Sequence, residues 1–102
     1  MELVLEGNDE VLKVRVIGEV VAEGCNSLRQ TVMEAATRQP DKVVINLSEV
    51  PFIDTSGIGV LVGLRAHLKS KKIDLALEDP SKKVHEVLKM TRLLPVFGLS
   101  DD

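Results

Sequence analysis

The chain has 102 residues and a net charge of −3, with 44% hydrophobic and 28% charged residues. This length predicts one domain with a single core, and the balance excludes an intrinsically disordered chain. Nucleic acid is not expected as a partner. The chain has no excess of Lys and Arg to neutralise phosphates, and its two aromatic residues are too few to build a surface for base stacking.

The cysteine content and the apolar runs indicate the compartment. The single cysteine, Cys25, cannot form an internal disulfide and has no cysteine partner for a zinc site, so we expect a reducing compartment and no metal. No basic leader precedes the first strand-like segment, and the longest apolar run, residues 58–64, is too short to span a membrane. The sequence predicts a cytoplasmic domain without membrane insertion.

The first half of the chain predicts a hairpin, a helix and a strand. Residues 2–6 and 11–17 form two strands around the turn-forming residues 7–10, and the second strand alternates apolar and basic side chains. Residues 24–39 show a helical stripe that Asn26 or Ser27 can cap and Pro40 ends. The β-branched run 42–47 is typical of a central strand buried on both faces.

The second half continues the alternation. A loop over residues 48–56 leads into a helix over residues 57–71, and residues 73–77 form a short strand. Asp79 and Pro80 predict the cap and first position of a helix ending near residue 90. Residues 95–97 predict a last short strand.

This order of elements places the chain in the α/β class. Strands that alternate with helices pair in parallel through right-handed crossovers, and the first hairpin adds an antiparallel edge. We therefore expect one domain over residues 1–102, with a mixed β-sheet of four to five strands and helices packed on it. The N-terminal antiparallel hairpin comes first in this sheet and the parallel strands follow.

The segment Asp54-Thr55-Ser56-Gly57 is the candidate for chemistry. It follows a buried strand and starts a helix, where free N–H groups and the positive end of the helix dipole favour an anion such as a phosphate on Ser56. The alternative is that Ser56 and Asp54 only cap the helix. Gly57-Ile58-Gly59 lacks the rest of a nucleotide-binding loop, and no Gly-x-Ser-x-Gly nucleophile motif occurs, so we expect neither an enzyme nor a cofactor.

Three segments together resemble the STAS domain of bacterial anti-sigma factor antagonists. They are Gly18-Glu19-Val20, residues 44–59 and residues 84–91, in this order along nearly the whole chain. The resemblance implies a STAS-like fold and regulation of transcription by partner switching. The unphosphorylated domain would bind an anti-sigma factor that is also a serine kinase, and phosphorylation of Ser56 would release it until a serine phosphatase restores binding. Thr55 is the second candidate for the phosphoacceptor.

The resemblance also assigns the neighbours of Ser56. Asp54, Thr55, Gly57, Ile58 and Gly59 would form the switch loop and contact the partner. In the second helix, Gly59 and Gly63 share one stripe, and its apolar residues either form a partner patch or are wholly buried.

Two departures from the family pattern motivate an alternative function. Val21 stands where many phosphorylated members have aspartate, and the chain ends at Asp102, where many members continue into a further helix. The alternative is a non-phosphorylated adaptor of a larger assembly, such as a stressosome-like or lipid-transport complex. A nucleotide-binding STAS module is a third possibility. Arg92 stands where the third helix of members often closes with glycine, so we expect a different turn there.

Overall fold

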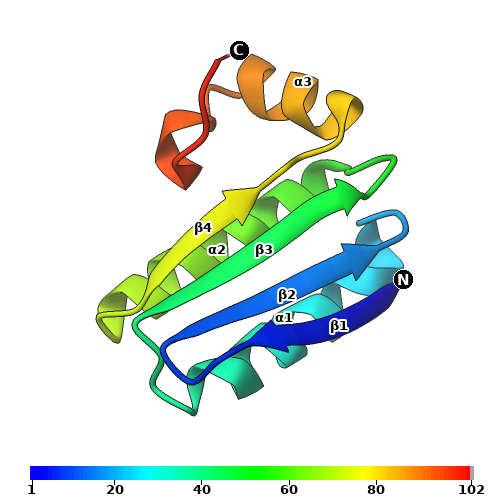
Figure 1. Cartoon of the computed structure of the whole chain (residues 1–102). Helices are drawn as coiled ribbons and strands as arrows, with labels where there is room; N and C mark the ends of the chain where they lie inside the picture. Colours follow the sequence, from blue (N-terminus) through cyan, green and yellow to red (C-terminus); the bar gives the residue numbers. More distant parts are fainter. Residues whose placement is uncertain (102) are drawn as a thin grey trace.

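Four strands form one mixed sheet. The computed structural model describes residues 1–101, and its strands are β1 (Glu2–Gly7), β2 (Val11–Ile17), β3 (Lys42–Glu49) and β4 (Asp74–Glu78). They lie in the order β1-β2-β3-β4 (Figure 1), with β1 antiparallel to β2 and the other neighbours parallel. The predicted α/β class and the N-terminal antiparallel hairpin followed by parallel strands are confirmed.

Two long helices cover the same face of this sheet. Helix α1 (Ala22–Ala36) connects β2 to β3, and α2 (Thr55–Ser70) connects β3 to β4. Both crossovers step in the same direction across the sheet, so right-handed connections place both helices on one side. Figure 1 looks onto the other, open face, with α1 and α2 behind the strands. Helix α3 (Lys82–Met90) and the 3₁₀ turn η1 (Pro95–Phe97) lie on the β4 side of the sheet.

The predicted fifth strand at residues 95–97 is wrong, because this segment is the 3₁₀ turn η1. Its backbone bonds are local, since the N–H of Phe97 donates to the carbonyls of Leu93 and Leu94 at 3.2 Å each. Pro95 has no N–H and a fixed φ, which suits the start of such a turn better than a sheet ladder. Within residues 1–101 the sheet therefore has four strands.

The predicted start of α3 is also wrong by two residues. Asp79 has a positive φ of 46°, and Ser81 caps the helix instead. The Ser81 hydroxyl oxygen accepts from the N–H of Val84 at 3.3 Å and donates to the carbonyl of Val50, while its N–H donates to the carbonyl of Leu47 at 3.2 Å. These long-range bonds to the end of β3 fix the helix start, which local cap signals cannot report.

Two more local predictions are corrected. Helix α1 begins at Ala22, and Val21 rather than Asn26 or Ser27 occupies its N-cap position, without a side-chain hydrogen bond. Arg92 adopts a left-handed φ of 60°, so α3 closes with the turn that glycine would favour, although arginine was expected to prevent it. The N–H of Leu93 donates to the carbonyl of Leu88 at 2.8 Å and completes this turn.

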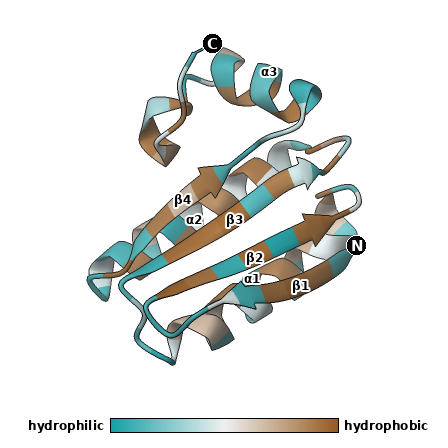
Figure 2. Ribbon diagram, viewed as in Figure 1, coloured by the Kyte–Doolittle hydropathy of each residue, from teal (hydrophilic) through white to brown (hydrophobic). Residues whose placement is uncertain are grey.

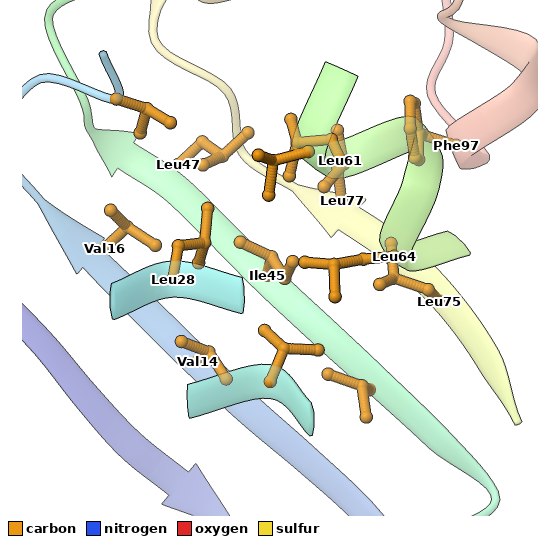
Figure 3. Packing of buried hydrophobic residues seen from close by; sticks show 14 of the residues in the cluster. Val14, Val16, Leu28, Ile45, Leu47, Leu61, Leu64, Leu75, Leu77 and Phe97 are labelled. Carbon is orange, nitrogen blue, oxygen red and sulfur yellow. The ribbon is translucent and has the colours of Figure 1, made fainter. Parts of the chain in front are cut away.

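The core lies between the sheet and the two long helices. Figure 2 shows apolar residues along the strands, and Figure 3 shows how side chains of β2, β3 and β4 pack against α1 and α2. Fully buried members of this core include Val14, Val16, Leu28, Ile45, Leu47 and Leu61. Their burial follows from the alternation of the strands and the helical stripes of α1 and α2.

The open face of β3 is covered by long polar side chains. Val44 and Asn46 are only 9% and 8% exposed, although no helix within residues 1–101 packs on this face. The Asn46 amide donates to Glu78 Oε2 at 2.8 Å, and Lys13 Nζ pairs with the same oxygen at 2.9 Å. Arg15 spans Glu6 and Glu49 with contacts of 3.1 and 2.6 Å. The prediction that β3 is central and buried on both faces is thus confirmed. On the open face, however, polar side chains rather than a helix cover the strand.

Candidate functional site

The switch segment lies where α2 begins. Asp54 has an extended backbone, and its Oδ1 accepts from the N–H of Gly57 at 2.9 Å. The carbonyl of Asp54 accepts from the N–H of Ile58 at 3.0 Å, which is the first turn of the helix. Asp54 is therefore the N-cap, and Thr55 and Ser56 are the first two helical residues.

A second chain segment holds this loop from the side. The N–H of Val20 donates to the carbonyl of Phe52 at 2.9 Å, and the N–H of Asp54 donates to the carbonyl of Val20 at 3.2 Å. Val20 also forms a parallel bridge with Ile53, and both side chains are buried. The residues before α1 thus pair with the loop before α2 and fix the direction in which Ser56 is presented.

Gly57 is required by this close approach. A Cβ on Gly57 would lie 2.6 Å from Ile53 Cγ1, 2.6 Å from the carbonyl oxygen of Val20 and 2.9 Å from Val20 Cγ1. Only glycine lets the first turn of α2 rest directly on the segment around Val20. Gly57 is buried and positions the switch loop; it does not offer a surface to a partner.

The remaining predicted site residues divide by exposure. Thr55, Ser56 and Gly59 are exposed, whereas Asp54 and Ile58 are half-buried. Among residues 1–101, neither the Thr55 nor the Ser56 hydroxyl takes part in a hydrogen bond, so both are open to solvent. The free N–H groups of the first turn and the helix dipole create a positive potential beside them. The geometry can accept an added anion on Ser56 without displacing a protein contact.

Two neighbours of the site were not expected from sequence. Cys25 lies behind the loop, where its thiol donates to the carbonyl of Val21 at 3.3 Å. Burial raises the pKa of the Cys25 thiol, and the Asp54 carboxylate raises it further, so the sulfur stays protonated and is a poor nucleophile. The second unexpected neighbour is Val20. The Gly18-Glu19-Val20 motif was the only sequence signal that drew attention to this residue.

The predicted patch on α2 is only partly exposed. Val60, Leu61 and Leu64 are buried in the core, whereas Val62 is exposed. Gly59 and Gly63 are also exposed, and together with Val60 and Leu64 they line a cavity of about 260 Å³ between α1 and α2. A Cβ on either exposed glycine would meet no atom within 4 Å. The inner stripe of α2 is therefore structural, and the glycine stripe faces an open groove.

The part of the chain that the structure describes, residues 1–101, contains no group of three His, Cys, Asp or Glu side chains placed to hold a metal ion. Over the same residues, none of the helices is long and apolar enough to cross a membrane.

Comparison with known proteins identifies the family. The model of the STAS domain matches residues 2–102. The chain belongs to the STAS domain family. An anti-sigma F factor antagonist from Paenibacillus polymyxa is 29% identical over 103 aligned residues, which cover 100% of this chain and 88% of the relative.

Solved structures show the same fold. A candidate anti-sigma factor antagonist from Thermotoga maritima superposes with a TM-score of 0.86 at 25% identity, covering 98% of this chain and 86% of that chain. The unphosphorylated form of the anti-sigma factor antagonist SpoIIAA gives a TM-score of 0.80 at 24% identity, with coverage of 92% and 84%. The phosphorylated form of SpoIIAA, the Bacillus cell fate determinant, gives 0.72 at 23% identity, with coverage of 92% and 86%. The predicted STAS family and fold are confirmed.

Proposed function

We propose that this STAS domain is a cytoplasmic anti-sigma factor antagonist that acts by partner switching, with Ser56 as the phosphoacceptor. The observation that carries the proposal is the exposed, unbonded Ser56 hydroxyl in the first turn of α2, on a loop that Val20 and Gly57 hold in place. Relatives named as anti-sigma factor antagonists, and the existence of SpoIIAA in both phosphorylation states, support it.

The proposed mechanism is electrostatic. A phosphoserine carries roughly −1.5 to −2 charges at neutral pH, which a helix N-terminus tolerates. The first turn of α2 would therefore keep its fold after modification. A partner surface pressed against Ser56 would instead have to desolvate and face this charge. Phosphorylation would abolish binding without unfolding the domain.

The partners follow from this mechanism. An anti-sigma factor with serine kinase activity would bind the unmodified chain through Thr55, Ser56 and Gly59, the exposed members of the switch segment. The kinase supplies the ATP site, and a serine phosphatase reverses the reaction. The chain itself is then a substrate and a binding module, with no catalytic residue.

The test combines phosphorylation with binding. The purified chain is incubated with ATP and the anti-sigma factor kinase encoded in the same genome, and the phosphate is located by mass spectrometry of peptides. We expect one phosphate on wild type and on Thr55→Ala, and none on Ser56→Ala. In a pull-down without ATP, Ser56→Ala should bind the kinase as wild type does, and Ser56→Asp should not. Phosphate on neither hydroxyl would refute the switch.

A constitutive adaptor is the second candidate, and Val21 favours it. Val21 occupies the N-cap of α1 beside the switch loop and offers no polar group there. An adaptor would remain bound to its assembly whatever the charge at position 56. Co-purification that is equal for wild type and Ser56→Asp would therefore support the adaptor over the switch.

A further inference from the structure

The outer edge of β1 is a second candidate site. Strand β1 lies at one end of the strand order, and β2 is its only strand neighbour. Figure 1 shows β1 at the rim of the sheet, on the side away from β4. Every residue of β1 is exposed or half-buried, and Leu5 keeps 45% of its surface in solvent. The opposite rim is closed by comparison, because Leu75 and Leu77 of β4 are only 7% and 4% exposed.

The backbone of β1 points alternate residues away from the sheet. The N–H of Asn8 donates to the carbonyl of Val11 at 3.0 Å and closes the hairpin between β1 and β2. Because N–H and C=O groups change sides at each residue, the even-numbered residues of β1 bond towards β2, whereas Leu3 and Leu5 point outwards. In the part of the chain that the structure describes, no backbone bond to another segment involves Leu3 or Leu5. Their outward groups are an unpaired template for a strand.

The two faces of this edge differ in chemistry. Leu3 and Leu5 lie opposite core valines of β2, on the face that α1 and α2 cover. Glu2, Val4 and Glu6 lie on the open face of the sheet. A strand added outside β1 would therefore meet leucines on one face and carboxylates on the other.

The nearest side-chain cations of the open face lie on β2, and both already have partners. Arg15 pairs with Glu6 at 3.1 Å and with Glu49 at 2.6 Å. Lys13, opposite Glu6, pairs with Glu78 at 2.9 Å. An added strand would be separated from both cations by β1 itself, so the first charged side chains that it meets are those of β1.

The charge along the edge is acidic. Among residues 1–101, no ion pair involves Glu2, or Asp9 and Glu10 in the turn that follows β1. All three side chains are exposed. Glu6 shares its cation with Glu49, so it is only partly compensated. This excess of carboxylates favours and steers basic partners.

We propose that the outer edge of β1 binds an extended segment of a protein partner in which apolar and basic residues alternate. The segment would add to the sheet beside β1, and its main chain would pair with the outward groups of Leu3 and Leu5. Its apolar side chains would cover Leu5 on the helix face, and its Lys or Arg side chains would lie beside Glu2 and Glu6 on the open face. The proposal does not depend on phosphorylation of Ser56.

Two other occupants fit this edge less well. A helix would leave the outward N–H and C=O groups of Leu3 and Leu5 unpaired. A second copy of β1 would bring its own Glu2 and Glu6 into the same row as these carboxylates, and like charges on neighbouring strands destabilise their pairing. A basic, extended segment satisfies both the backbone groups and the charges.

The test uses a synthetic peptide of about eight residues with alternating Lys and Val, long enough for one strand. Exchange of the backbone amides of the full chain with water is followed by NMR with and without the peptide. We expect exchange at Leu3 and Leu5 to slow several-fold, while Val4 and Glu6, whose amides face β2, change little. The same peptide with Glu in place of Lys should leave all four amides unchanged.

A matched pair of variants checks the charge argument. Glu2→Lys reverses a carboxylate of the edge, and Glu86→Lys makes the same change at an exposed position of α3, on the β4 side of the sheet. Both raise the net charge equally, so a difference between them reports the position of the charge. Glu2→Lys should weaken the Lys peptide roughly three- to tenfold, whereas Glu86→Lys should change its affinity by less than about twofold.

Methylated peptides check the backbone pairing without changing the protein. N-methylation of the valines removes the donors that an antiparallel segment turns towards β1, and N-methylation of the lysines removes those of a parallel segment. At least one of the two methylated peptides should therefore lose its binding.

Four results would overturn the proposal. The first is unchanged exchange at Leu3 and Leu5 with millimolar Lys peptide. The second is full binding of both methylated peptides or of the Glu peptide. The third is equal weakening by Glu2→Lys and Glu86→Lys. The fourth is protection of Leu3 and Leu5 without peptide that grows with protein concentration, together with dimers in sedimentation, since a second copy of the chain would then occupy the edge.

Discussion

The glycines of α2 allow a sharp test of how the switch loop is held. Gly57, Gly59 and Gly63 all lie in one helix, where glycine costs about 1 kcal/mol relative to alanine. The surroundings of the three positions differ. A Cβ at position 57 would lie 2.6 Å from the carbonyl oxygen of Val20, whereas at positions 59 and 63 it would meet nothing within 4 Å. The same substitution should therefore have opposite effects along one helix.

The magnitudes follow from two competing contributions. Gly63→Ala gains helix propensity alone and should raise the free energy of unfolding by roughly 0.5–1 kcal/mol. Gly57→Ala makes the same gain but must also displace Val20, and overpacking of this kind costs about 1–3 kcal/mol. The contact is to a backbone carbonyl, which cannot rotate away, so we expect the upper part of this range. Gly57→Ala should then lower the free energy of unfolding by roughly 1–2 kcal/mol.

The assay is urea unfolding followed by far-ultraviolet circular dichroism, because the chain has no tryptophan or tyrosine. The two variants should differ by roughly 2–3 kcal/mol, or about 10 °C or more in thermal midpoint. Gly59→Ala serves as a second control and should behave as Gly63→Ala does. If Gly57→Ala were as stable as Gly63→Ala, the packing of α2 on Val20 would not be what fixes the loop.

Two further predictions concern the cap of α1 and the open sheet face. Val21→Asp should supply the side-chain N-cap that α1 lacks. In urea titrations its free energy of unfolding should therefore be about 1 kcal/mol higher than that of Val21→Ala. Equal stability of the two variants would contradict the cap geometry. The pKa of Glu78 is lowered by the Asn46 hydrogen bond and then by Lys13, so its ionised form stabilises the fold at neutral pH, and this stabilisation is lost as pH falls through the depressed pKa. Glu78→Gln should flatten the acid limb of a stability–pH profile below the ordinary pKa of a glutamate carboxyl, and parallel profiles for variant and wild type would refute this.

Much of the fold could be predicted because its signals are local. The alternation of residues 11–17 depends on the period of a strand, and the boundaries of β2 match the prediction residue for residue. The predicted start of the second helix at residue 57 was two residues late, since α2 begins at Thr55, but the same signals correctly placed Ser56 at a helix N-terminus. Local signals also misled. Asp79 and Pro80 form a good helix start in isolation, but bonds from Ser81 to the end of β3 moved the start of α3.

The sequence by itself determined the class of fold, the order of its helices and four strands and the position of Ser56 at the N-terminus of a helix, because periodicity and capping act over a few residues. Only the tertiary structure decided that Val20 supports the switch loop, that Gly57 must be glycine and that both long helices share one face. Each of these features depends on contacts between segments far apart in the chain, and their geometry is fixed only when the strands pair and the helices pack.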